Sequence, residues 1–118
     1  MIHKVKQAKA VYLSTRIVDM RKSINGLAAI VQGSFELDPY EGCVFVFTNR
    51  AHDKIKVLQW DTDGFVLYYK RREKGKFQWP TTISAETETV NITSSDLKRL
   101  LAGLVMEQFI PHVNYSIY

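Results

Sequence analysis

The sequence predicts a single α+β domain, built as a mainly antiparallel β-meander sheet of about five strands with one helix before it and one after it. The 118 residues are enough for one compact domain with one hydrophobic core. Apolar residues recur at helical spacing in two segments, residues 20–31 and 97–104. Between these segments, short apolar runs are separated by turns too short to hold a crossover helix, which favours antiparallel neighbours.

The first helix is expected behind a short strand. Residues 1–10 are polar and basic and form a predicted N-terminal arm, ahead of a domain over residues 11–104. Residues 11–15 are mostly β-branched, aromatic or apolar, as is typical of a strand. Asp19 is a candidate N-cap for a helix that ends at Gly33. One face of that helix is apolar and carries Met20, Ile24, Leu27, Ala28 and Val31.

The middle of the chain is predicted to form the β-meander. Strands are expected over residues 43–48, 54–60, 65–71, 76–79 and 87–92. The run that begins at Cys43 is apolar throughout, so this strand should be buried on both faces. Gly64 closes the turn that starts at Asp61 and is available for a positive φ. Pro80 closes the fourth strand, because proline cannot donate to a sheet ladder.

The second helix is predicted to begin after Thr93. The Thr93 side chain is the expected N-cap, and Asp96 stands three residues later, in the capping-box position. One face of this helix is marked by Leu97, Leu100, Leu101 and Leu104. Residues 105–118 show no clear period and form a predicted C-terminal tail.

No catalytic or metal-binding motif is recognisable in the sequence. Its one cysteine, Cys43, opens an apolar run, which favours a core thiol in a reducing compartment over a nucleophile. The three histidines, His3, His52 and His112, lack metal-ligand spacing. We therefore expect no enzyme activity, no metal and no cofactor. Because neither a signal peptide nor a long apolar segment is visible, we expect a cytoplasmic protein without membrane contact.

Positive charge is concentrated in two parts of the chain. The net charge is +4, from 16 Lys and Arg against 12 Asp and Glu. Residues 50–76 hold eight basic and four acidic residues, and residues 1–22 hold six basic residues and one acidic residue. Aromatic residues alternate with the basic ones between Trp60 and Trp79, a mixture that can contact phosphates and bases. Alternatively, the rings fill the core and the basic side chains protect an exposed sheet edge.

Two basic residues, Arg21 and Lys22, stand at the predicted start of the first helix. Positive charge in the first turn opposes the helix dipole, and a bound phosphate or acidic partner would offset that cost. Together with the hairpin region, these residues predict one electropositive surface for the DNA backbone. The predicted DNA-binding residues are Arg21, Lys22, Lys54, Lys56, Lys70, Arg71, Arg72, Lys74 and Lys76.

Three ordered segments of the sequence together resemble one known family. They are Val11-Tyr12-Leu13 with Asp19-Met20-Arg21-Lys22 and Gly26-Leu27-Ala28-Ala29-Ile30-Val31; Phe45-Val46-Phe47 with Asn49-Arg50 and Asp53-Lys54-Ile55-Lys56-Val57-Leu58; and Trp60-Asp61, Asp63-Gly64-Phe65, Tyr69-Lys70-Arg71, Glu73, Gly75, Phe77 and Trp79-Pro80. Over residues 11–104 the chain resembles the TnpB (Orf2-like) accessory protein of the insertion-sequence sixty-six family.

The resemblance implies a protein encoded in a bacterial insertion sequence beside a separate DDE-type transposase, whose DNA transposition it assists without catalysing it. The implied partners are this element-encoded transposase and DNA, the latter through backbone contacts. The alternative is a protein-interaction adaptor of the transposition complex with no direct DNA binding. An independent nuclease is a third hypothesis, and no catalytic residues come with the family. The oligomeric state and any DNA sequence preference are left open by the sequence.

Overall fold

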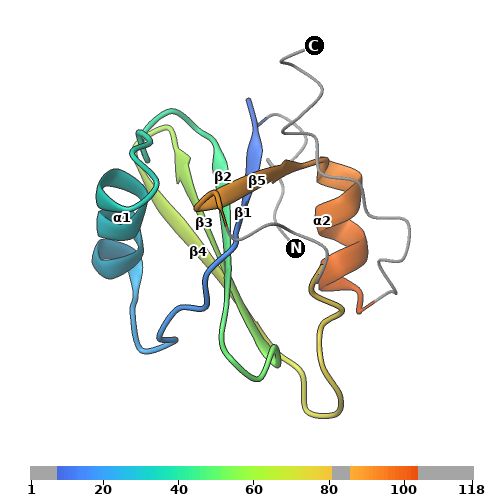
Figure 1. Ribbon diagram of the computed structural model, residues 1–118. Helices are drawn as coiled ribbons and strands as arrows, with labels where there is room; N and C mark the ends of the chain where they lie inside the picture. The colour runs from blue at the N-terminus through green and yellow to red at the C-terminus, as the bar shows by residue number, and fades with distance from the viewer. Residues whose placement is uncertain (1–7, 81–85, 104–118) are drawn as a thin grey trace.

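The computed structural model describes residues 8–80 and 86–103, which form one mixed five-stranded sheet with a helix on each side (Figure 1). The strand order across the sheet is β4-β3-β2-β1-β5. The elements in chain order are β1 (Val11–Ser14), α1 (Ile24–Gly33), β2 (Val44–Thr48), β3 (Lys54–Asp61), β4 (Gly64–Arg71), β5 (Thr89–Ile92) and α2 (Ser94–Leu101). This arrangement confirms the predicted α+β class.

The sheet is antiparallel except at one pairing. Strands β2, β3 and β4 form the predicted meander, and β5 pairs antiparallel with β1. Strand β1 runs parallel to β2, with Val11 opposite Val44. Parallel neighbours cannot be joined by a tight turn, so α1 serves as the crossover between them. The sequence predicts the helix between these two strands but not their parallel pairing, since it predicts a mainly antiparallel sheet.

Two layers of apolar side chains fill the space between the sheet and its helices. On one face, α1 contributes Leu27 and Val31 to a cluster with Phe45 of β2. On the other face, the leucines of α2 pack on Val57 and on Phe77. All five residues of β2 are buried, as predicted, because its two faces belong to different clusters. Burial of each such side chain stabilises the fold by roughly 1.5–3 kcal/mol.

Helix α1 begins later than predicted. Its N-cap is Ser23, and Asp19 does not cap it. The Asp19 carboxylate instead accepts a hydrogen bond from the Arg21 backbone N–H at 2.9 Å, and the Asp19 carbonyl accepts one from Lys22 N at 3.1 Å. Aspartate favours such tight turns for the same reason that it favours helix caps, since its short side chain reaches the nearby backbone. Residues 19–22 are therefore a turn, and Arg21 and Lys22 precede the helix.

The predicted fourth strand over residues 76–79 is wrong. After β4 the chain turns at Gly75, whose φ is +74°, and crosses the end of the sheet as a loop. Phe77 N–H donates to the carbonyl of His52 at 2.7 Å, and the Phe77 ring is buried. Phe77 is therefore buried from a loop, because burial of a ring does not require a sheet ladder.

The second hairpin turn also differs from its prediction. The positive φ falls on Thr62, at +57°, and Asp63 N–H donates to the Asp61 carbonyl at 2.5 Å. Gly64 begins β4 without a positive φ. Strand β4 therefore begins at Gly64, one residue earlier than the predicted strand over residues 65–71.

Helix α2 begins as the sequence predicts. Thr93 Oγ1 accepts a hydrogen bond from Asp96 N at 2.9 Å, and Thr93 N donates to the Asp96 carboxylate at 3.1 Å. This capping box confirms the predicted start. The expected strand over residues 87–92 is confirmed over Thr89–Ile92. Leu104, the tail over residues 105–118 and residues 1–7 of the arm lie outside the described residues, so the predicted domain boundaries stay predictions.

Candidate nucleic-acid interface

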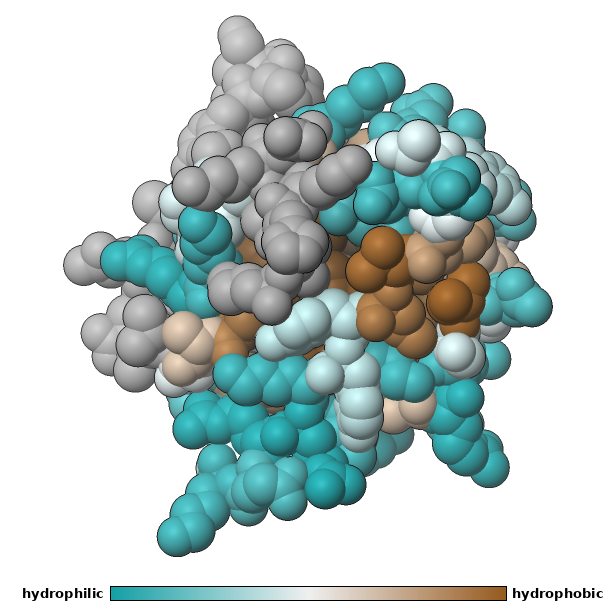
Figure 2. All heavy atoms as spheres, turned by 180° about the vertical axis from the view of Figure 1, so that it is seen from behind, coloured by the Kyte–Doolittle hydropathy of each residue, from teal (hydrophilic) through white to brown (hydrophobic). Residues whose placement is uncertain are grey.

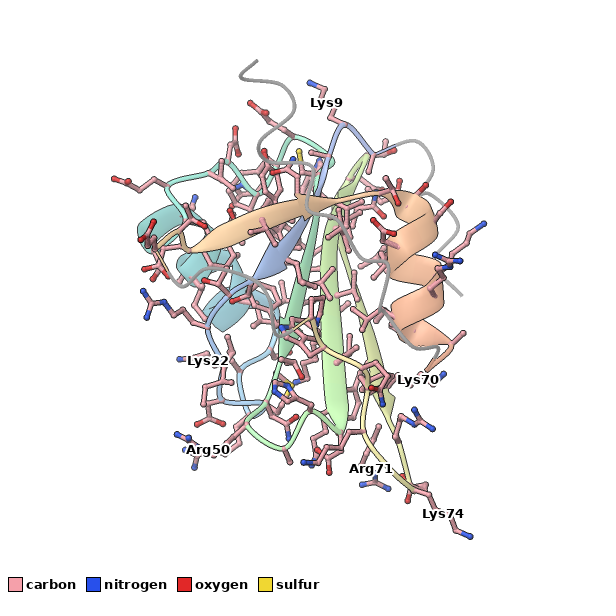
Figure 3. All side chains as sticks on the ribbon, turned by 45° about the vertical axis from the view of Figure 1, so that its right-hand side comes forward. Lys9, Lys22, Arg50, Lys70, Arg71 and Lys74 are labelled. Atoms are coloured by element: carbon pink, nitrogen blue, oxygen red, sulfur yellow. The ribbon has the colours of Figure 1, made fainter. Side chains whose placement is uncertain are left out.

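Basic residues from several segments gather at one end of the sheet, where β1, β2 and β4 end and β3 begins. In Figure 3, Lys22, Arg50, Arg71 and Lys74 all lie at this end, while Lys9 lies at the opposite end. We call it the basic end of the sheet. It comprises three connecting segments, residues 15–23, 49–53 and 72–80, together with the adjoining strand residues.

Backbone hydrogen bonds tie these three segments to the sheet and to each other. Val18 N donates to the carbonyl of Thr48, the last residue of β2, at 2.9 Å. Arg72 N donates to the Asp53 carbonyl at 2.8 Å, which extends the ladder of β3 and β4 by one bond. The contact between Phe77 and His52 holds the third segment. Charged side chains that are far apart in the sequence are thus carried on a fixed backbone.

A shallow groove of about 550 Å³ opens at this end, on the face of the sheet that α1 covers. Its walls are residues 18–21 on one side and residues 49–51 on the other, and Lys54 and Tyr69 form its floor. Tyr69 is 48% exposed. We call this the basic groove, because its walls and floor contribute Arg21, Arg50 and Lys54.

The first wall carries a local ion pair. The Arg21 guanidinium binds the Asp19 carboxylate through two nitrogens, with Nη2 at 2.7 Å and Nε at 3.0 Å from Oδ2. These bonds lower the pKa of Asp19 to about 2 and raise the pKa of Arg21. The Arg21 side chain is nevertheless 91% exposed. An anion that binds Arg21 must therefore compete with Asp19 while remaining in contact with water.

The opposite wall is a turn stiffened by its own side chains. Asn49 Nδ2 donates to Asp53 Oδ1 at 2.7 Å, and Asn49 Oδ1 accepts from the backbone N–H groups of Asp53 and Lys54 at 3.2 Å. The hydrogen bond from Asn49, and then that from Lys54 at 3.3 Å, lower the pKa of Asp53. Arg50 is exposed on top of this turn, and no carboxylate of the described residues lies within 4 Å of its guanidinium.

Lys56 is hydrogen-bonded to one wall of the basic groove. Its ammonium donates to the carbonyl oxygens of Met20 and Lys22, both at 2.8 Å, and lies 5.3 Å from the centre of the Tyr69 ring. Two of its three donors are thus used by the backbone of the 19–22 turn. Lys56 therefore fixes the position of the wall that carries Arg21.

A second hollow of about 300 Å³ lies beside the basic groove, across the 49–53 turn. His52 and Trp79 line it with their rings stacked, at 6.0 Å between centres and 7° between planes. Burial lowers the pKa of His52, and the charge of Lys76 lowers it further, which favours the neutral imidazole. Its Nδ1 is buried without a hydrogen-bond partner among the described residues. Within residues 8–80 and 86–103, no three His, Cys, Asp or Glu side chains are placed to hold a metal.

Comparison with known proteins places the chain in a family. The family model described as IS66 Orf2-like protein matches residues 9–110. The chain belongs to the IS66 Orf2-like family. It is 33% identical to y4jC and 37% identical to y4hO, two proteins of Sinorhizobium fredii (strain NBRC 101917 / NGR234) described as uncharacterized. Each match spans 94 residues and covers 80% of this chain, with 78% of y4jC and 79% of y4hO. No solved structure matches it.

Membership in the IS66 Orf2-like family identifies an accessory protein associated with transposition and confirms the resemblance seen in the sequence. None of the helices that the structure describes is long and apolar enough to cross a membrane.

The IS66 Orf2-like fold brings some of the nine predicted site residues together and separates others. Arg21 and Lys54 line the basic groove, and Lys56 and Arg71 share its sheet face. Lys22 lies beside it, held through its backbone by Lys56. Lys74 and Lys76 are exposed in the 72–80 loop. Whether these residues bind DNA stays a prediction.

Lys70 and Arg72 have structural partners on the α2 side. Lys70 donates to the carbonyl of Leu101, at the end of α2, with a distance of 2.6 Å. Arg72 donates to the Lys76 carbonyl at 2.9 Å and lies over the Phe77 ring. Strand residues alternate between faces, so Lys70 and Arg71 point to opposite sides of the sheet.

Arg50 is a candidate that the predicted site omitted. It contributes to the basic excess of residues 50–76 and lies in the turn between β2 and β3, but it is not among the nine residues of the predicted site. The signal that could have found it is this turn itself, because exposed turn residues at the end of a sheet are well placed for binding. Tyr69 was likewise treated as an interleaved aromatic, whereas the structure places it on the groove floor.

Proposed function

We propose that this IS66 Orf2-like protein is a non-catalytic accessory protein that assists DNA transposition by a separate DDE-type transposase in the cytoplasm, and that the basic end of its sheet contacts the DNA backbone. One observation carries this proposal: basic residues from three separate segments meet at one end of the fold (Figure 3). Exposed Lys and Arg side chains bind phosphates and release counterions, which makes such a surface a favourable contact for DNA.

The charge of this surface is moderate, which fits an accessory role. Arg21, Lys54 and Arg71 each have a carboxylate close by, from Asp19, Asp53 and Glu73 respectively. Arg50, Lys22 and Lys74 have no ion pair among the described residues. We therefore expect a few phosphate contacts, weak affinity at physiological salt and little preference for DNA sequence, since phosphates carry no base identity.

A protein-interaction adaptor is the second candidate function. Figure 2 shows a hydrophobic patch on the rear face of the molecule, with hydrophilic surface above and below it. Val66, on the edge strand β4, is 45% exposed. An exposed apolar patch of this kind is typical of a protein-binding surface, and the transposase is the partner that this reading assigns to it.

Binding of the full chain to duplex DNA from the element's ends, and to the purified transposase, separates the two functions. The proposed function predicts DNA binding at low salt that weakens steeply as salt rises. Capture of the transposase without any DNA binding, even at low salt, would leave only the adaptor.

The non-catalytic part of the proposal has its own test. DNA incubated with the purified chain and Mg²⁺ or Mn²⁺ should be neither cleaved nor joined. Metal-dependent nicking that a single carboxylate substitution abolishes would overturn this part, because nucleases use carboxylates to hold their metal ions.

A further inference from the structure

We propose that the basic groove binds an unpaired stretch of DNA, with a base stacked on the Tyr69 ring and the adjoining phosphates on Arg50 and Arg21. This inference rests on the proposed function and names its substrate class. It predicts that the protein acts where the two strands of the element's DNA are separated.

The position of Tyr69 is the first support. Tyr68 faces the α2 side and packs against the core, whereas Tyr69 faces the groove and is 48% exposed. In the β-ladder Tyr69 stands opposite Lys56, whose ammonium lies 5.3 Å from its ring centre. The ring is therefore held on a rigid strand by a neighbouring cation while much of it stays open to a ligand. A fixed, exposed ring of this kind is what base stacking requires.

The arrangement of cations around Tyr69 is the second support. Arg50 stands on the 49–53 turn, Arg21 on the facing wall, and Lys54 on the floor beside the ring. A strand whose base stacks on Tyr69 would place its phosphates between the two arginines. Arg50 is the stronger of these two contacts, because Asp19 already occupies Arg21. Basic side chains that flank an exposed ring are the general pattern of single-strand binding sites.

Stacking on Tyr69 favours an unpaired strand over a duplex. The groove is shallow and open to solvent, with a volume of about 550 Å³. Inside a duplex the bases are stacked on each other, so their faces cannot reach Tyr69. Duplex DNA would then gain the phosphate contacts but not the stacking.

Fluorescence anisotropy with the full chain tests this inference. The probes are a short labelled oligothymidine, an abasic strand of the same length and a duplex of the same length. The variants are Tyr69→Leu, which removes the ring, and Tyr69→Trp, which keeps a ring. Tyr40→Leu is the matched control, because Tyr40 is a second exposed tyrosine, packed on Trp60 and Phe65 away from the groove.

We expect wild type to bind oligothymidine about five- to a hundredfold more tightly than the abasic strand, as one stacked base predicts. Tyr69→Leu should bind the two strands equally, while Tyr69→Trp and Tyr40→Leu should keep the preference. The Tyr69 variants should unfold at nearly the same urea concentration as wild type, since the residue is half exposed and the contact that Tyr69→Leu loses is the one with Lys56.

Two results would overturn the inference, and they differ in whether the proposed function still holds. If Tyr69→Leu binds oligothymidine as wild type does, or if wild type does not distinguish it from the abasic strand, stacking is excluded, and duplex binding would still support the proposed function. If none of the three probes binds at low salt, the proposed DNA contact fails together with the inference.

Discussion

The ammonium of Lys56 is hydrogen-bonded to the backbone carbonyl of Lys22 at 2.8 Å. One basic residue of the predicted site thus holds in place the segment that carries another. A second bond, to the Met20 carbonyl, completes the contact between β3 and the 19–22 turn. Lys56 is therefore a positioning residue for the wall of the basic groove, and its charge is largely used within the fold.

Lys56→Met should lower the free energy of unfolding by about 1–2 kcal/mol, because it removes two charge-assisted hydrogen bonds in a half-buried position. Urea unfolding measures this change, and hydrogen exchange should show faster opening around residues 19–22. Lys74→Met, at an exposed position without an ion pair, is the control and should stay within about 0.5 kcal/mol of wild type. Equal effects of the two substitutions would contradict the positioning role.

Substitution of Lys70 should lower the stability of the fold and leave DNA binding unchanged. Its ammonium binds the carbonyl of Leu101 at the C-terminus of α2, where a positive charge also interacts favourably with the helix dipole. Lys70→Met should cost about 1 kcal/mol in unfolding free energy and should speed hydrogen exchange at Ala102 and Gly103. The salt dependence of DNA binding should be unchanged. A flatter salt dependence in this variant would assign Lys70 to the DNA contact instead.

The pair of Asp19 and Arg21 should be visible in an acid titration. The pKa of Asp19 is lowered from its ordinary 3.8 to about 2, first by the side-chain hydrogen bond from Arg21. Since the folded pKa lies below the unfolded one, the stabilisation from this pair is complete above pH 3.8 and is lost as the pH falls through 2.

Carboxyl carbon-13 shifts measured by NMR report this pKa directly. In Arg21→Met the pKa of Asp19 should rise towards 3.8, because its main hydrogen-bond donor is gone. An Asp19 that already titrates near 3.8 in wild type would show that the ion pair does not form in solution.

The sequence predicted correctly those elements whose local pattern is compatible with only one kind of secondary structure. The capping box of Thr93 and Asp96 fixed the start of α2, because both side chains reach back to backbone groups that only a helix leaves free. Cys43 and the five residues after it predicted a strand buried on both faces. The prediction that Asp19 caps the first helix was wrong, since a carboxylate can cap a helix or close a turn, and here it accepts hydrogen bonds from Arg21 within a turn.

The basic surface was predictable in part. The period of two along a strand already separates Lys70 from Arg71, so the sequence could have shown that they face opposite ways. The partners of Lys56 and Lys70 could not be predicted, because all three are backbone carbonyls more than thirty residues away in the chain. The turn that carries Arg50 is a local pattern that the sequence does show, but its place beside Arg21 depends on the parallel pairing of β1 and β2, which local patterns do not specify.

The salt dependence of duplex binding by Arg50→Ala tests most directly the claim that the basic end of the sheet contacts DNA. The matched control is Lys9→Ala, which removes one charge at the opposite end of the molecule (Figure 3). In a plot of log affinity against log salt, Arg50→Ala should reduce the steepness of the slope by roughly 0.9, the value for one phosphate contact, and Lys9→Ala should not change it. A slope that Arg50→Ala leaves unchanged, with Lys9→Ala flattening it, would contradict this placement of the DNA.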